Sequence, residues 1–128
     1  MKLNNKQFEY FKKRCEYWLE YWGLKNWDVR YKFEKTANEE AAVTSSSLVD
    51  HMAVITLDNV SEWDDVSNDY LDKVAFHEVD EVRYARIESL AGARFLDPAH
   101  FREAVHELIV QEENVVFKKL IKPKKEDL

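Results

Sequence analysis

Apolar side chains recur at helical spacing in three stretches of the chain. The first covers residues 5–22, the second about 69–91 and the third about 97–120. In the third stretch, Asp97 followed by Pro98 is a typical helix start, with an aspartate at the cap and a proline in the first turn. The pattern therefore predicts one helix near the N-terminus and two long consecutive helices toward the C-terminus.

Three shorter stretches between the first and second helices are typical of strands. Residues 27–33 alternate strictly between apolar and polar, whereas 41–47 and 52–57 are rich in small, β-branched and apolar side chains. We expect an α+β fold in which an antiparallel sheet of about three strands packs against three helices. No composition break divides the chain, so one domain over residues 1–122 and a polar tail over 123–128 are predicted.

Composition narrows the class of function. The chain has 128 residues, 45% of them hydrophobic, and a net charge of -6, with no basic face interleaved with aromatic residues, which disfavours nucleic-acid binding. Cys15 is the single cysteine, so an internal disulfide is excluded, and its place on an apolar stripe predicts burial. Neither a signal peptide nor an apolar run of membrane-spanning length is found, so a cytoplasmic protein is expected. The oligomeric state is not indicated.

The second predicted helix carries the most informative motif, His77-Glu78-Val79-Asp80-Glu81. His77 and Glu81 are four residues apart, so they share one face of the helix and could hold one metal ion. Glu78 lies about 100° further round, where a general base beside a metal-bound water would sit. This position is also the middle of the apolar arc, and an unpaired carboxylate buried there would be costly. Glu78 must therefore face a cation, a donor or a wet cleft.

The third predicted helix repeats this arrangement, because His106 and Glu113 fall near the centre of its apolar arc. A short connection favours an antiparallel helix pair, which would place residue 113 level with residue 77. Glu113 is then the natural third ligand beside His77 and Glu81. His106 would lie roughly 10 Å further along the axis, where it either reaches the metal at a steep crossing or orients a ligand.

Two questions stay open at this stage. The same acidic groups could instead form a buried ionic network with arginine, in which Glu78 or Glu113 pairs with one of Arg83, Arg86 and Arg102. If a metal is bound, Zn²⁺ is expected, although two carboxylates and one imidazole would also suit Mn²⁺ or Fe²⁺.

The order of elements and the motif together resemble the minimal zincin metallopeptidase fold. More narrowly, the chain is similar to small SprT-like and gluzincin-like proteins that bacteriophages often encode. The resemblance is carried by residues 74–79 on the first of the two helices and by His106 and Glu113-Asn114 on the second. It implies that His77 and residue 81 are ligands and that Glu78 is the base. Position 81 is a glutamate where the family's H-E-x-x-H motif has histidine, and the gluzincin third ligand would map to Glu113.

Two functions from different classes follow. The first is a metal-dependent hydrolase of the zincin type acting on peptide or protein, phage or prophage encoded, with residues 51–57 as the sheet edge that pairs with extended peptide. The second is a non-catalytic phage accessory protein that keeps the fold and binds a protein partner. The Glu81 departure favours the second function, whereas the intact Glu78 favours the first. In either case the protein would act in the cytoplasm of the host cell.

Overall fold

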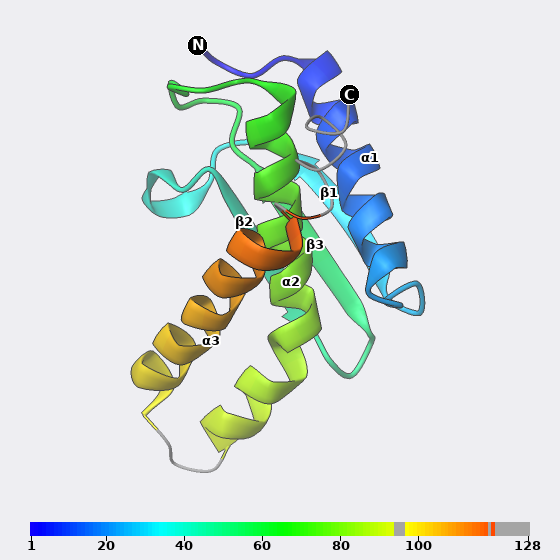
Figure 1. Cartoon of the computed structure of the whole chain (residues 1–128), viewed down its shortest axis with the longest axis vertical. Helices are drawn as coiled ribbons and strands as arrows, with labels where there is room; N and C mark the ends of the chain where they lie inside the picture. Colours follow the sequence, from blue (N-terminus) through cyan, green and yellow to red (C-terminus); the bar gives the residue numbers. More distant parts are fainter. Residues whose placement is uncertain (94–96, 118, 120–128) are drawn as a thin grey trace. The chain divides into compact units, whose positions relative to one another are not determined.

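The computed structural model describes residues 1–93, 97–117 and 119 (Figure 1). The predicted order of one helix, three strands and two helices is confirmed, and the fold is α+β. In chain order the elements are α1 (Asn5–Tyr21), β1 (Asp28–Phe33), the 3-10 turn η1 (Ala37–Glu39), β2 (Ala42–Ser47), β3 (Met52–Leu57), α2 (Asn68–Ala93), α3 (Pro98–Glu112) and the π-helical turn η2 (Glu113–Phe117).

The chain falls into two compact units, one over Met1–Arg83 and one from Tyr84 onward, so that α2 contributes to both. The prediction of a single domain over residues 1–122 stays a prediction. The predicted tail, residues 123–128, lies outside the described residues, as does the predicted end of the third helix at Leu120.

The sheet of the first unit is mixed, so the prediction of a purely antiparallel sheet is wrong in part. Its order is β1-β3-β2, with β3 parallel to β1 and antiparallel to β2. After the edge strand β1, the chain passes through η1 to β2, which is the strand at the opposite edge of the sheet. The β2–β3 hairpin then inserts β3 between the two outer strands. Strand β3 is therefore paired on both sides, and the expectation that residues 51–57 form the open sheet edge is wrong.

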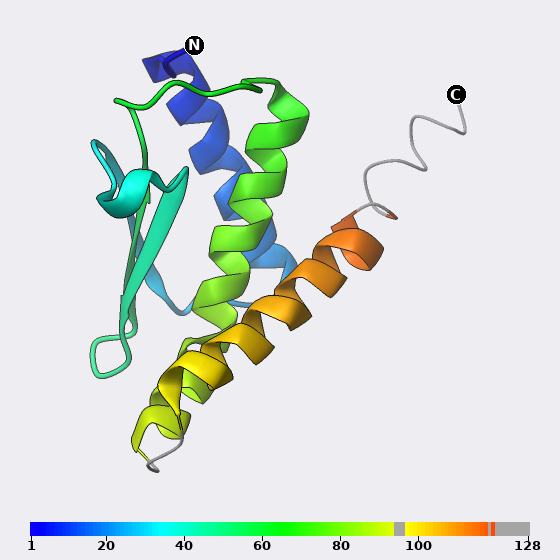
Figure 2. The same cartoon turned by 90° about the vertical axis from the view of Figure 1, so that its left-hand side faces the viewer.

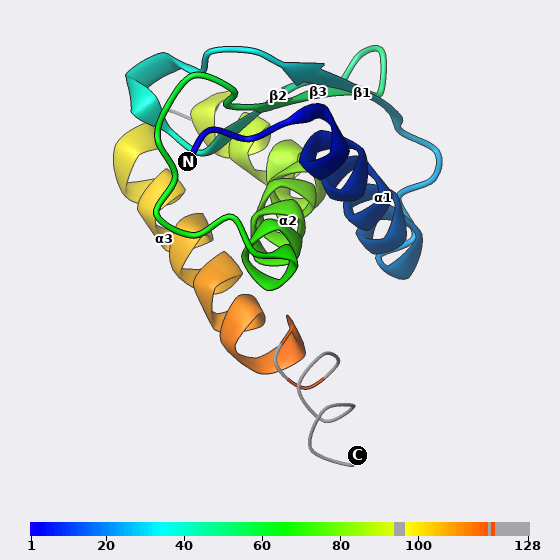
Figure 3. The same cartoon turned by 90° about the horizontal axis from the view of Figure 1, so that it is seen from above.

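Both helices of the first unit pack on the same face of this sheet (Figures 2 and 3). Helix α1 starts at Asn4 with a capping box, in which Asn4 and Gln7 each accept the other's backbone N–H. Its apolar stripe is buried, as the spacing predicts, and Cys15 is part of it. The fully buried side chains of this core are Phe11, Cys15, Trp18, Ile55, Leu57, Leu71, Phe76, Val79 and Val82.

The second unit is built on the end of α2 and on α3. Tyr84 packs with Val105 and Ile109, and its hydroxyl donates to the carboxylate of Glu112. Asp97 caps α3 by accepting the backbone N–H of Ala99, with Pro98 next to it, as predicted. The predicted uninterrupted helix gives way to a π-helical turn at Glu113. In the part of the chain that the structure describes, no helix is long and apolar enough to cross a membrane.

Candidate metal centre

Helix α2 places the His77-Glu78-Val79-Asp80-Glu81 motif against the sheet. The helix starts where Ser67 accepts the backbone N–H of Tyr70 through its hydroxyl. Along the motif Val79 is fully buried and Glu78 is only 5% exposed, whereas His77 and Glu81 are half-buried. This is the distribution that the apolar arc predicts, with Glu78 in its middle and the other two at its edge.

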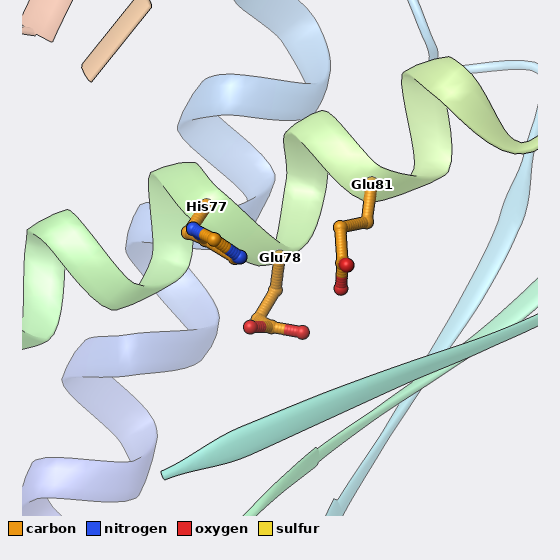
Figure 4. Close-up of side chains that lie close together, drawn as sticks. All are labelled: His77, Glu78 and Glu81. Atoms are coloured by element: carbon orange, nitrogen blue, oxygen red, sulfur yellow. The ribbon is translucent and has the colours of Figure 1, made fainter. Parts of the chain in front are cut away.

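The three side chains of the motif come together. His77, Glu78 and Glu81 each offer one ligand atom, and these atoms all lie within 4.8 Å of one another. Figure 4 shows Glu78 and Glu81 projecting from the side of α2 that faces the strands, with His77 beside them. One imidazole and two carboxylates at this separation can share a single cation.

Thr44 of β2 belongs to the same site. Its hydroxyl lies 2.8 Å from Glu78 Oε1, to which it donates, and 3.2 Å from the backbone carbonyl oxygen of Glu78. The contact fixes the carboxylate of Glu78 against an outer strand of the sheet. The sequence gives no signal for it, because a threonine within a strand has no distinguishing neighbour and the contact joins residues 34 positions apart.

The environment of Glu78 favours its neutral form. Burial raises the pKa of this carboxyl, and the charge of Glu81 raises it further, to about 8, although His77 and the Thr44 hydroxyl act in the opposite direction. Glu78 and Glu81 are also hydrogen-bonded to each other. Two carboxyl groups this close cannot both be charged cheaply, so the site would gain from a divalent cation.

Arg83 is one of the arginines that the sequence offers as a partner for the acidic groups of the motif. Arg83 pairs with Asp80 at 3.3 Å, and its guanidinium lies 4.0 Å from the centre of the Trp22 ring. The charges that shift the pKa of Glu78 are those of Glu81 and His77. The alternative of a buried ionic network, in which Glu78 or Glu113 pairs with Arg83, Arg86 or Arg102, stays a prediction.

The two site residues predicted on the third helix belong to the second unit. Glu113 is buried at 7% exposure at the first position of the π-helical turn, and His106 is exposed on α3. Both residues were predicted near the centre of the apolar arc of the third helix, but only Glu113 is buried. Whether Glu113 or His106 completes the site stays a prediction.

Comparison of the chain with models of known protein families, with curated proteins and with solved structures found no match.

Proposed function

We propose that the protein is a metal-dependent hydrolase of the zincin type that acts on peptide or protein. The observation that carries the proposal is the cluster of His77, Glu78 and Glu81, whose ligand atoms lie within 4.8 Å of one another. His77 and Glu81 would hold the ion and Glu113 or His106 would complete the set, as the resemblance to zincins implies. Zn²⁺ is the expected ion, with Mn²⁺ or Fe²⁺ as alternatives that the two carboxylates would also accept.

Glu78 would serve as the general base. A bound metal ion would lower the pKa of its water and polarise the carbonyl group of the substrate. Glu78 would accept the proton of the attacking water in its charged form. In the metal-free protein its pKa of about 8 keeps it mostly neutral, and the charge of a bound cation would lower this pKa and free the carboxylate to act as the base. Thr44 keeps one oxygen of this carboxylate in a fixed position through the 2.8 Å hydrogen bond.

The peptide would lie along β2. This strand is an outer strand of the described sheet, and it contacts Glu78 through Thr44. An extended peptide can add to such an edge through its backbone hydrogen bonds, which brings its carbonyl groups past the base. The peptide-pairing role that the sequence predicts for residues 51–57 is therefore proposed for residues 42–47.

A second function is favoured by one observation. Glu81 stands where the zincin motif has histidine. A carboxylate ligand donates more negative charge to the metal than an imidazole does, so it would make a metal-bound water less acidic. A non-catalytic accessory protein of a phage or prophage, which keeps the fold and binds a protein partner in the host cytoplasm, would tolerate this change. The buried Glu78 argues for the enzyme, because a scaffold gains nothing from a carboxyl group there.

The substitution Glu78→Gln tests the proposed base. It removes the proton acceptor and keeps the shape, so hydrolysis of an unfolded protein such as casein should fall by at least about 100-fold, the usual contribution of a general base. Bound metal, measured by mass spectrometry of the purified protein, should be retained. Glu34→Gln, which changes an exposed carboxylate outside the site, is the matched control and should leave hydrolysis unchanged.

Unchanged hydrolysis in Glu78→Gln would refute the assigned base. Absence of hydrolysis in the unmodified protein, with metal bound, would favour the accessory protein.

A further inference from the structure

A second feature of the first unit is a cavity of about 300 Å³ beside the start of α2. It is lined by Ala41, Ser61, Glu62, Trp63, Asp64, Asp65 and Tyr70. Trp63 is 8% exposed and meets Tyr70 edge to face, with 5.9 Å between the ring centres. Trp63 is therefore largely buried, and the small exposed part of the residue lines the cavity.

Asp58 holds the loop that forms the cavity. Its carboxylate accepts the backbone N–H groups of Val60 and Ser61, each at 2.7 Å, together with the hydroxyl of Thr36 at 2.8 Å. Burial raises the pKa of Asp58, but the hydrogen bonds from Ser61, Thr36 and Val60 outweigh it and lower the pKa to about 2. The fully buried Asp58 carboxylate therefore fixes the start of this loop, up to Ser61.

The lining of the cavity suits an organic cation. Three carboxylates, those of Glu62, Asp64 and Asp65, lie beside the aromatic walls. The α-ammonium of Met1 is bound at this rim, 2.8 Å from Glu62 Oε2 and 3.0 Å from the carbonyl oxygen of Trp63. A lysine or arginine side chain would place its apolar stem against the rings and its charge among the carboxylates.

The cavity lies on the same two elements as the His77-Glu78-Glu81 cluster. On α2, Tyr70 precedes His77 by seven residues, which is about 10 Å along a helix axis at 1.5 Å per residue. On the strand side, Ala41 precedes Thr44 by three residues, which is also about 10 Å at 3.3 Å per residue. An extended peptide covers this distance with about three residues.

We propose that this cavity, lined by Trp63, Tyr70, Asp64 and Asp65, binds a lysine or arginine side chain of an extended peptide that lies along β2. The bound basic residue sits about three positions from the bond that faces Glu78. The position of that bond rests on the proposed function, whereas binding of the basic side chain does not.

The test uses binding rather than hydrolysis. The probe is the acetylated and amidated peptide Ala-Ala-Ala-Arg-Ala-Ala-Ala, which has three residues on either side of the arginine and so fits either direction of binding. It is added to the isotope-labelled full chain in the presence of a chelator, and the indole N–H of Trp63 and the amides of residues 42–47 are followed by nuclear magnetic resonance. The matched peptide carries citrulline, which has the same shape without the charge.

We expect the arginine peptide to shift both sets of signals and the citrulline peptide to bind about tenfold more weakly, because the carboxylates contribute through charge. The double variant Asp64→Asn, Asp65→Asn should also bind the arginine peptide about tenfold more weakly than the unmodified protein does. The control variant Glu34→Gln should bind it with unchanged affinity. Asparagine can still accept the backbone N–H of Ser67 that Asp65 accepts at 2.8 Å, so the loop should stay folded.

Equal affinities for the two peptides, or an unchanged affinity in the double variant, would overturn the proposal. The same Trp63 shift with CaCl₂ alone would show that the loop binds metal ions instead. A response of Trp63 without any response of residues 42–47 would separate the cavity from the proposed cleft. Because the metal is removed throughout, failure of the hydrolase proposal would leave the binding result intact.

Discussion

Glu78 is the residue on which the proposed chemistry depends. It is 5% exposed, it accepts a hydrogen bond from Thr44, and it shares its surroundings with the carboxyl group of Glu81. Such a group is costly in an apolar core unless its proton or a cation neutralises it. The burial of Glu78 therefore affects both the stability of the metal-free protein and its affinity for a metal.

The raised pKa of Glu78 predicts how the free energy of unfolding depends on pH. Without metal, folded Glu78 keeps its proton up to about pH 8, whereas the unfolded chain releases it near 4.5. Its contribution is therefore fully present below pH 4.5 and is lost as the pH rises to about 8. Glu78→Gln stays neutral and should remove this loss, which amounts to a few kcal/mol at most, since one pKa unit corresponds to about 1.4 kcal/mol.

The measurement is urea unfolding in chelator at several pH values between 4.5 and 8. The Glu78→Gln variant should be more stable than the unmodified protein at the upper end of this range and equal to it at the lower end. An identical pH dependence in the two proteins would mean that Glu78 is not buried as a neutral acid.

At the scale of elements, α1 and α2 are joined by a polar contact inside the core. Asp72 is 4% exposed, and its Oδ1 accepts Arg14 Nε at 2.8 Å and Trp18 Nε1 at 2.9 Å. No sequence pattern indicates this contact, because an aspartate four residues into a helix is common in solvent. It explains how the two helices hold a fixed register on the sheet.

We expect Asp72→Ala to lower the free energy of unfolding by about 1–3 kcal/mol, because the buried indole N–H of Trp18 loses this acceptor, whereas Arg14, whose side chain is 22% exposed, can be solvated. The control is Arg30→Ala, which breaks an ion pair with Asp28 whose side chains are 67% and 57% exposed. It should cost less than about 1 kcal/mol. Chemical denaturation measures both values, and similar losses in the two variants would show that Asp72 does not anchor the helices.

The elements themselves could be predicted, but the sheet topology could not. Periodicity is a local property, so it located α1, the strands and the starts of α2 and α3. The parallel pairing of β1 with β3 depends on the path of the loop over residues 34–41, which has no periodic signal. For the same reason the open edge was predicted at residues 51–57, whereas β3 is the central strand and β2 is an outer strand.

At the scale of the whole molecule, one part of the candidate site could be predicted from the sequence and another part could not. Helical geometry fixes the directions of His77, Glu78 and Glu81, so their meeting was predictable from spacing within one helix. Thr44 and the cavity beside Trp63 were not, because both are formed by residues far apart in the sequence. Glu113 and His106 lie in the second unit, and their part in the site stays a prediction.

The most direct test of the account is a calorimetric titration of the chelator-stripped protein with Zn²⁺, repeated with Mn²⁺. We predict one equivalent of bound metal, which is lost in His77→Ala. Glu34→Gln should bind as the unmodified protein does. No binding of either ion, or binding that survives His77→Ala unchanged, would contradict the proposal that this cluster is a metal centre.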